Sequence, residues 1–235
     1  MSAPRFSIPL AVGILLFSGA EAHANGFWLP TGSGAFGDLP VRSMMELKYL
    51  ETVRQRLDFS CGSAAVATLL THHYDRPTKE SEVFLSMWET GDQQKIPKHG
   101  FSMLDMKRFL DSVGFSADGF QIPASRIGKV GVAGIVLLEG LHQPHFVVVT
   151  GEHNGEILVS DPARGVWSLR VETLEELWNG IFFVVRKKAS LARSNFNDFE
   201  SWKHRRLAPV SAEALGRFAV PDPLSFPLPL EYNFE

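Results

Sequence analysis

The 235-residue chain contains a single cysteine, and the surrounding residues suggest a chemical role for it. Cys61 stands at the expected start of an Ala-rich helix, within the stretch QRLDFSCGSAAVATLL, which runs from Gln55 to Leu70. A thiolate is a strong nucleophile, and the positive end of a helix dipole favours its formation. Gly62 follows, and we expect its lack of a side chain to let a substrate backbone approach the sulfur. Most free cysteines are small buried hydrophobes, so position alone leaves both interpretations open.

A nucleophilic thiol needs a base, and the chain has eight histidines that could take this role. His142 and His145 stand directly before the β-branched run Phe146–Val149, which predicts a strand, and His153 falls in a turn. The others are expected on the surface or in a signal peptide: His23, His72, His73, His99 and His204.

A predicted hairpin separates His145 from His142. Two glycines bracket a turn centred on His153, so strands 145–150 and 156–161 are expected to pair with His145 directly opposite Asp161. Opposed residues of an antiparallel pair share a face, with Cβ atoms about 5 Å apart. A carboxylate there could orient an imidazole, whereas a register shift of one residue would put the two on opposite faces.

Two further side chains could complete a thiol enzyme. Asn179 is the alternative to Asp161 as the group that orients the histidine, and we favour Asp161. Gln55 stands six residues before Cys61 and could donate its amide to the oxyanion of a tetrahedral intermediate, together with the Cys61 backbone N–H. The order cysteine, histidine, carboxylate along the chain is that of papain-like thiol enzymes.

These residues together resemble the double-glycine leader peptidase family, whose members are papain-like peptidase domains of bacteriocin-exporting ABC transporters. The resemblance covers roughly residues 45–188 and rests on Gln55, Cys61-Gly62, His145-Phe146-Val147-Val148 and Asp161-Pro162. It implies a cysteine endopeptidase that cuts after a Gly-Gly or Gly-Ala leader end. In this family the glutamine is the oxyanion donor, the cysteine the nucleophile, the histidine the base and the aspartate its orienter.

This chain departs from the family pattern at one position and in its context. Ser60 stands where the family commonly has an acid directly before the cysteine. The chain carries a signal peptide and no transporter or ATPase segment, so it resembles the stand-alone exported members. The stretches DFSCG and GFSMLDMKRFL are most similar to the peptidases of functional-amyloid secretion systems. A role in the secretion of amyloid or bacteriocin-like substrates is therefore one hypothesis.

The order of predicted elements indicates an α+β fold, with the nucleophile helix packed on a C-terminal antiparallel sheet. The first part of the chain favours helices, and the period changes to that of strands near Val132. Helices are expected at 62–74, 80–88, 102–113 and 173–178, and strands at 132–138, 145–150, 155–160, 166–171 and 181–186.

The ends of the chain differ from its middle in composition. Residues 1–24 are typical of a secretory signal peptide, so a periplasmic or secreted protein is expected, although a retained N-terminal anchor is an alternative. Residues 25–45 are predicted to form a flexible lead-in, 46–188 the peptidase domain and 189–235 an irregular Pro-rich extension.

Charge and motifs exclude several other classes of function. The net charge of −3 and the lack of basic blocks argue against nucleic-acid binding. The sequence has no phosphate-binding loop motif, so nucleotide binding is not expected. No cofactor is expected, because a zinc site at His142 and His145 with Glu139 and Glu152 would lie across a loop and a strand. The expected partners are a polypeptide substrate and outer-membrane or other export machinery. A catalytically silent adaptor and an acyl transferase remain alternatives.

Overall fold

The computed structural model describes residues 26–30, 36–40, 43–140, 143–203 and 206–207, in two compact units that divide after Arg42. In the first unit, strands β1 (Gly26–Pro30) and β2 (Phe36–Pro40) form an antiparallel hairpin. This differs from the lead-in expected over 25–45, because two apolar runs flank a Gly-rich segment there, which is itself a hairpin pattern. The signal peptide at 1–24 lies outside the described residues.

The second unit begins with helices. They are α1 (Met44–Lys48), α2 (Cys61–His73), α3 (Glu80–Thr90), α4 (Ile96–His99) and α5 (Met103–Ser112). Helix α5 begins at the expected capping box: the Asp105 N–H donates to Ser102 Oγ at 3.2 Å and the Ser102 N–H donates to the Asp105 carboxylate at 2.9 Å. None of the helices that the structure describes is both long and apolar enough to span a bilayer.

The sheet follows the helices, as predicted. Its strand order is β3-β8-β4-β5-β6-β7-β9, and every neighbouring pair is antiparallel except β7 and β9. The strands are β3 (Ala117–Gln121), β4 (Gly134–Leu138), β5 (His145–His153), β6 (Glu156–Asp161), β7 (Gly165–Arg170), β8 (Ile181–Val185) and β9 (Arg206–Leu207).

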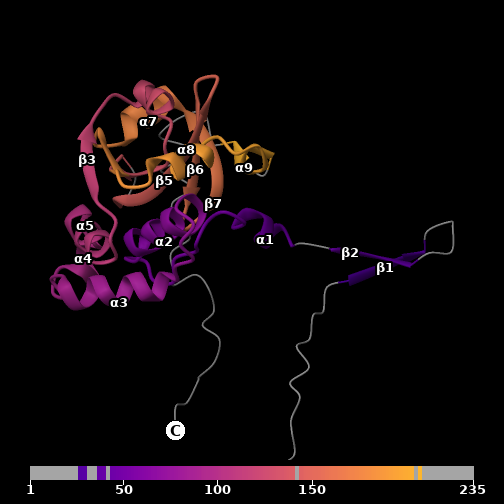
Figure 1. Ribbon diagram of the computed structural model, residues 1–235, viewed down its shortest axis with the longest axis horizontal. Coiled ribbons are helices and arrows are strands. Elements are labelled where there is room, and N and C mark those ends of the chain that lie inside the picture. Colours follow the sequence, from indigo (N-terminus) through magenta and orange to yellow (C-terminus); the bar gives the residue numbers. More distant parts are fainter. Residues whose placement is uncertain (1–25, 31–35, 41–42, 141–142, 204–205, 208–235) are drawn as a thin grey trace, which may run out of the picture. The chain divides into compact units, whose positions relative to one another are not determined.

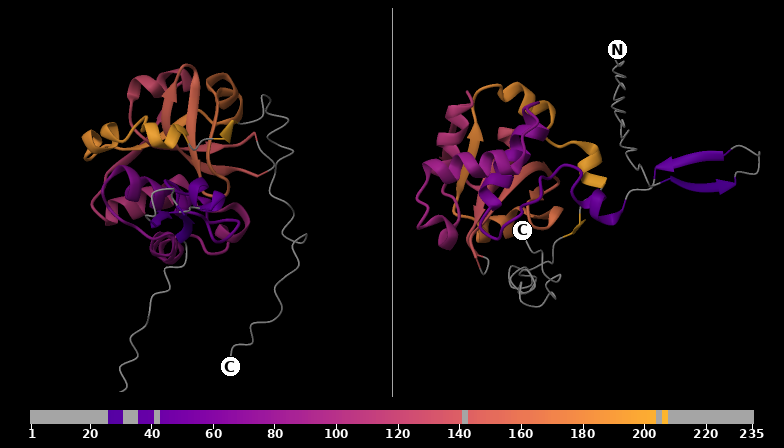
Figure 2. Two further views of the ribbon diagram at one scale, coloured as in Figure 1. Left: turned by 90° about the vertical axis from the view of Figure 1, so that its right-hand side faces the viewer. Right: turned by 90° about the horizontal axis from the view of Figure 1, so that it is seen from below.

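The core of this unit lies between α2 and the sheet. Helix α2 contacts β4 and β5, and its small side chains, such as Ala64 and Ala65, are fully buried. Helices α2 to α5 gather on one side, and the sheet, with α7 (Val171–Leu177), lies on the other (Figures 1 and 2). Small residues allow α2 to pack closely on all sides, which explains how so apolar a helix is accommodated.

The chain beyond residue 188 has more regular structure than expected. Helices α8 (Ala189–Ser194) and α9 (Phe199–Lys203) and the short strand β9 replace the start of the predicted irregular extension. They belong to the same compact unit as the helices and the main sheet. The prolines on which the prediction rested all stand after residue 207, outside the described residues.

Candidate active site

Cys61 is the first residue of α2 and is 5% exposed. Ser60 precedes it, and its hydroxyl does not cap the helix. Instead, Ser60 Oγ accepts the Leu57 N–H at 3.1 Å and donates to the Leu57 carbonyl at 3.0 Å, which closes the turn before the cysteine. Ser60 thus has a local structural role at the position where the family resemblance implies an acid.

Aromatic side chains hold this turn against the neighbouring helices. Phe59 packs against Phe84 of α3, which in turn makes an edge contact with Phe101, with ring centroids 5.4 Å apart. A Cβ atom at Gly62 would lie 3.3 Å from the Phe101 Cβ. Gly62 is buried, so its lack of a side chain lets Phe101 pack on α2, and the approach of a substrate backbone at this residue stays a prediction.

His145 and Asp161 meet at one end of the β5–β6 hairpin. The distance from His145 Nε2 to Asp161 Oδ1 is 2.7 Å. Asp161 is fully buried, and its oxygens also accept the Ala163 N–H at 2.8 Å, the Arg164 N–H at 3.1 Å and the Trp167 Nε1–H at 3.2 Å. The carboxylate is therefore fixed in place and fully hydrogen-bonded, as a buried charge must be.

The register that brings these two residues together differs from the predicted one. Asp161 is in line with Val147, and His145 is its diagonal neighbour on the same face, because Val148 pairs with Ser160. The turn is centred between Asn154 and Gly155, because His153 pairs with Glu156. The prediction of direct pairing is wrong by two residues, and a shift of two preserves the shared face.

Electrostatics favours a charged histidine at this site. Burial alone would lower the pKa of His145, but the charge and hydrogen bond of Asp161, joined by Cys61, raise it to about 10. Burial likewise opposes ionisation of Asp161, yet His145 and Arg164 hold the pKa of Asp161 below its usual value. The pair is an imidazolium and a carboxylate at neutral pH, with the Cys61 thiol beside the imidazolium.

Gln55 lies next to the same hairpin end. Its backbone N–H donates to the Pro162 carbonyl at 3.0 Å, which ties the loop before Cys61 to the residue after Asp161. The side-chain amide donates to the Leu57 carbonyl at 3.1 Å, and the amide oxygen is buried without a hydrogen bond within the described residues. The role of oxyanion donor thus stays a prediction for Gln55.

The remaining predicted site residues are not brought into the pair. Asn179 uses its side-chain oxygen to accept the Ile181 N–H at 3.1 Å, and Asp161 is the carboxylate that contacts His145. His142 lies outside the described residues. Among those that are described, no three histidine, cysteine or acidic side chains form a metal-binding group.

Two features escaped the sequence analysis. His73 is 3% exposed at the end of α2, so the expectation of a surface residue is wrong, because the helix is buried along most of its length. Trp167 was not singled out, although its indole donates to Asp161. The signal that could have found this contact is the pairing of β6 with the strand that carries Trp167, and using it requires the correct pairing of these strands.

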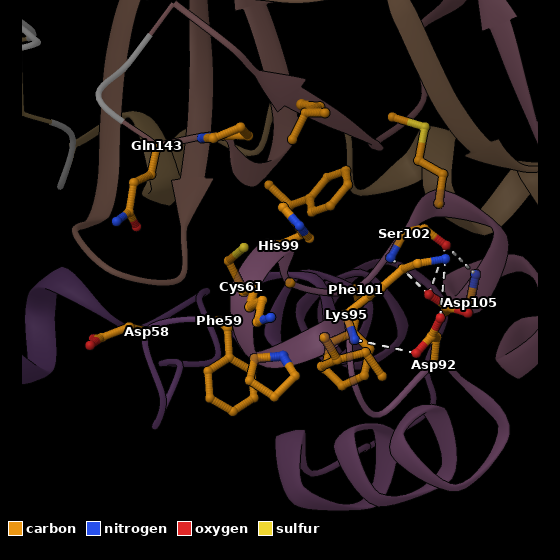
Figure 3. Close-up of a pocket in the computed structure, with 18 of the residues that line it drawn as sticks. Asp58, Phe59, Cys61, Asp92, Lys95, His99, Phe101, Ser102, Asp105 and Gln143 are labelled. Carbon is orange, nitrogen blue, oxygen red and sulfur yellow. Dashed lines mark hydrogen bonds and ion pairs between the residues drawn. The ribbon is translucent and has the colours of Figure 1, made fainter.

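A cavity of about 1000 Å³ opens beside Cys61. It is lined by the segment from Lys95 to Met103, by Phe59, and by Gln143 and Phe146 from the other side. Figure 3 shows Cys61 between the loop of Gln143 and the residues of α4 and its flanking loops. Lys95 forms an ion pair with Asp92 at 3.1 Å at its edge. A polypeptide could therefore reach the thiol along this cavity.

Comparison with known families places this geometry in context. The model of the peptidase C39 family matches residues 50–190, which include Cys61, His145 and Asp161. The chain belongs to the peptidase C39 family. Membership bears out the resemblance to double-glycine leader peptidases and identifies the domain as that of a cysteine peptidase.

Curated relatives of this C39 peptidase domain are similar over the same region. The probable functional amyloid protease FapD of Pseudomonas aeruginosa is 38% identical over 145 residues, and that of Pseudomonas fluorescens is 37% identical. Each alignment covers 62% of this chain and 64% of the relative. The chain therefore matches slightly less than two thirds of the length of these relatives.

A solved structure confirms the fold. The peptidase domain of Streptococcus ComA, a bifunctional ABC transporter involved in quorum sensing, superposes with a TM-score of 0.50 at 19% identity. The superposition covers 57% of this chain and 96% of the ComA domain. The predicted α+β, papain-like fold is thus confirmed for the C39 domain.

Proposed function

We propose that this protein is an exported cysteine endopeptidase that cuts a secreted polypeptide through a Cys61–His145–Asp161 triad. The observation that carries the proposal is the 2.7 Å contact between His145 and the buried Asp161, with Cys61 close enough to raise the pKa of His145. Nucleophilic acyl transfer by a cysteine requires a thiol next to an imidazole and a carboxylate that orients this imidazole.

The mechanism follows from these positions. The Cys61 thiolate attacks the scissile carbonyl carbon, and the His145 imidazolium gives its proton to the leaving amine as the C–N bond breaks. A water molecule, deprotonated by His145, then attacks the thioester carbonyl; the C–S bond breaks, which releases the acid product and restores the Cys61 thiolate beside the His145 imidazolium. Asp161 keeps the imidazole oriented throughout and stabilises its charged form before the first proton transfer and after the second.

The oxyanion of each tetrahedral intermediate needs nearby donors. No side chain caps the start of α2, so the Cys61 backbone N–H at the helix start is one donor in this proposal. Gln55 supplies the other after its amide turns away from the Leu57 carbonyl, to which it donates at 3.1 Å. The tie between the Gln55 N–H and Pro162 keeps this loop beside the triad during that rotation.

The substrate is proposed to be a polypeptide cut after small residues such as Gly-Gly. Support comes from the resemblance to double-glycine leader peptidases and from the FapD relatives, which are described as probable functional amyloid proteases. We therefore place the protein in the periplasm or outside the cell, alongside export machinery, with an amyloid or bacteriocin-like protein as its substrate. A substrate-binding adaptor without catalysis is the alternative function.

Replacing the nucleophile tests the proposal. The full chain, Cys61→Ala and Cys61→Ser are each incubated with a peptide that contains an internal Gly-Gly, and the products are identified by mass spectrometry. We expect cleavage after Gly-Gly by the parent and a loss of at least about 1000-fold in both variants, because the residual rate comes from binding alone. Ser194→Ala, which removes a hydroxyl bonded to the Leu191 carbonyl of its own helix, serves as the matched control and should cleave at close to the parent rate.

Two results would count against the proposal. If Cys61→Ala cleaves as fast as the parent, Cys61 is not the nucleophile. If the parent binds the peptide and cuts neither it nor co-exported proteins, the adaptor is the better description. Circular dichroism of each variant verifies that the fold is retained.

A further inference from the structure

An irregularity in β5 determines which face of the sheet His145 occupies. Strand β5 pairs with β6 in one register from His153 to Gly151 and in another from Val149 onward, so Thr150 is an extra residue between them. If the pairing next to the turn continued along β5 without this bulge, Asp161 would align with Val148. His145 would then face the opposite side of the sheet, because alternate residues of a strand share a face.

Asn197 holds this bulge in place through its backbone and its side chain. Its backbone N–H donates to the Thr150 carbonyl at 2.9 Å, and its Oδ1 accepts the Glu152 N–H at 2.6 Å. Asn197 has a φ of 65°, a left-handed conformation that asparagine tolerates better than most residues. A Cβ atom at Gly151 would lie 2.5 Å from Asn197 Oδ1, so the absence of a side chain at residue 151 permits the contact.

The segment that carries Asn197 also contacts the helical side of the domain. Asn195 Nδ2 donates to the His72 carbonyl near the end of α2, at 3.2 Å. Ser201 Oγ donates to the Glu51 carboxylate, which precedes the loop of Gln55. Residues 189–203 therefore connect the nucleophile helix to the strand of the base. Most of this segment lies beyond residue 190, where the match to the C39 family ends.

We propose that Asn197 is a positioning residue of the peptidase, which holds the Thr150 bulge and so keeps His145 on the same face as Asp161. It touches neither substrate nor the reacting atoms and acts through the backbone of β5. This inference rests on the proposed function, since it concerns the triad of that reaction. It adds Asn197, which lies beyond the residues matched by the family, to the residues that position the triad.

The experiment measures kinetics and the titration of His145 in four forms of the full chain. Asn197→Gly keeps the backbone conformation and loses Oδ1, whereas Asn197→Asp keeps an oxygen acceptor. Ser194→Ala is the control, because among the described residues the Ser194 hydroxyl bonds only to the Leu191 carbonyl of its own helix. We expect Asn197→Gly to lower kcat about tenfold at nearly constant KM, because displaced catalytic groups lose rate more than affinity.

A second readout separates positioning from simple loss of stability. In Asn197→Gly the imidazole titration of His145, followed by NMR, should move to lower pH as its contact with Asp161 loosens, and Asn197→Asp should restore most of the rate and the titration. If Asn197→Gly folds poorly, Gly151→Ala disrupts the same contact from the strand side, with the rate normalised to the folded fraction.

The outcomes distinguish this inference from the proposed function. A parent that cleaves, with Asn197→Gly as active as Ser194→Ala, overturns the positioning role alone. An unchanged His145 titration, with kcat reduced only in proportion to the folded fraction, also overturns it. A parent that does not cleave any Gly-Gly peptide overturns the proposed function, and the NMR titration still reports on Asn197.

Discussion

At the scale of single residues, Asp161 is the best-supported part of the site. Its two oxygens accept hydrogen bonds from backbone and indole donors in addition to His145, and it has no exposed surface. A carboxylate buried in this way stays ionised only because its neighbours are donors and cations. Its fixed position explains why His145 carries a proton far above the ordinary range for histidine.

Removal of this charge should move the pH dependence of catalysis. Because the pKa of His145 is raised to about 10, its imidazolium is present below that pH and is lost above it. In Asp161→Asn the burial that opposes protonation remains while the main favourable charge is gone, so the alkaline limb of kcat/KM should shift to lower pH. The pH profile of kcat/KM for Asp161→Asn and Asn179→Ala is the measurement.

An alkaline limb that shifts in Asn179→Ala and stays in place in Asp161→Asn would assign the orienting role to the amide.

The pair of His145 and Asp161 also makes folding stability depend on pH. The contribution of His145 is fully present below its unfolded pKa of 6.5 and is lost as pH rises toward 10.

Residue types, their order and a predicted hairpin together led to the three members of the proposed triad. A single cysteine at a helix start, a histidine at a strand start and an aspartate before a proline are visible in the sequence. The contacts of Trp167 and Asn197 were not predictable in this way, because an indole or amide donor becomes significant only once its strand or loop is placed. The present hydrogen bond of Gln55 to Leu57 was equally invisible.

At the scale of elements, the β5–β6 hairpin shows what the sequence can and cannot predict. The dipeptide Asn154-Gly155 is a strong two-residue turn pattern, and both residues have positive φ, 52° and 79°. A turn centred on this dipeptide was therefore available from sequence. The bulge at Thr150 was not, because it depends on Asn197 from a distant segment. The shared face of His145 and Asp161 was predicted for a register that the hairpin does not have.

Helix α2 carries a buried histidine, His73, that should limit stability in acid. Burial, reinforced by His72, lowers the pKa of His73 to about 4, although Asp198 opposes the shift. Neither ring nitrogen has a hydrogen-bond partner among the described residues. Since the unfolded chain binds this proton near pH 6.5, folding stability should fall between pH 6.5 and 4, by an amount on the order of 3 kcal/mol.

His73→Leu tests that expectation by removing the titrating group while keeping a buried apolar side chain. Urea denaturation at several pH values should show a flatter loss of stability between pH 6.5 and 4 than in the parent. The free energy of unfolding near pH 7.5 should be equal or higher, since an unsatisfied polar group is gone. The pKa of His72 is also lowered by burial, so some slope should remain. Identical slopes in the two proteins would contradict the assignment.

At the scale of the whole molecule, the order of helices and strands predicted the α+β architecture, and the comparison with the ComA domain confirms it. The missed elements are short. Strand β3 has the sequence ADGFQ, which is polar and contains glycine, and it is a strand because it pairs with β8. Helices α4, α8 and α9 have four to six residues and are too short for a periodic pattern.

The two reactive groups meet at the site but come from opposite sides of the domain. Cys61 comes from the helical side and His145 from the sheet, and their contact depends on how α2 packs on β4 and β5. The central claim is that this contact activates the thiol. A peptide that ends in Gly-Gly and bears a thiol-reactive electrophile in place of the next residue probes it directly.

The decisive measurement is the rate at which this peptide labels Cys61 in the parent and in His145→Ala, followed by intact-mass and peptide-mapping mass spectrometry at pH 7. The account predicts one label per chain, located on Cys61, with the rate reduced at least about 100-fold in His145→Ala, the size of a general acid–base contribution. Equal labelling rates in the two proteins, or no labelling of the folded parent, would contradict it.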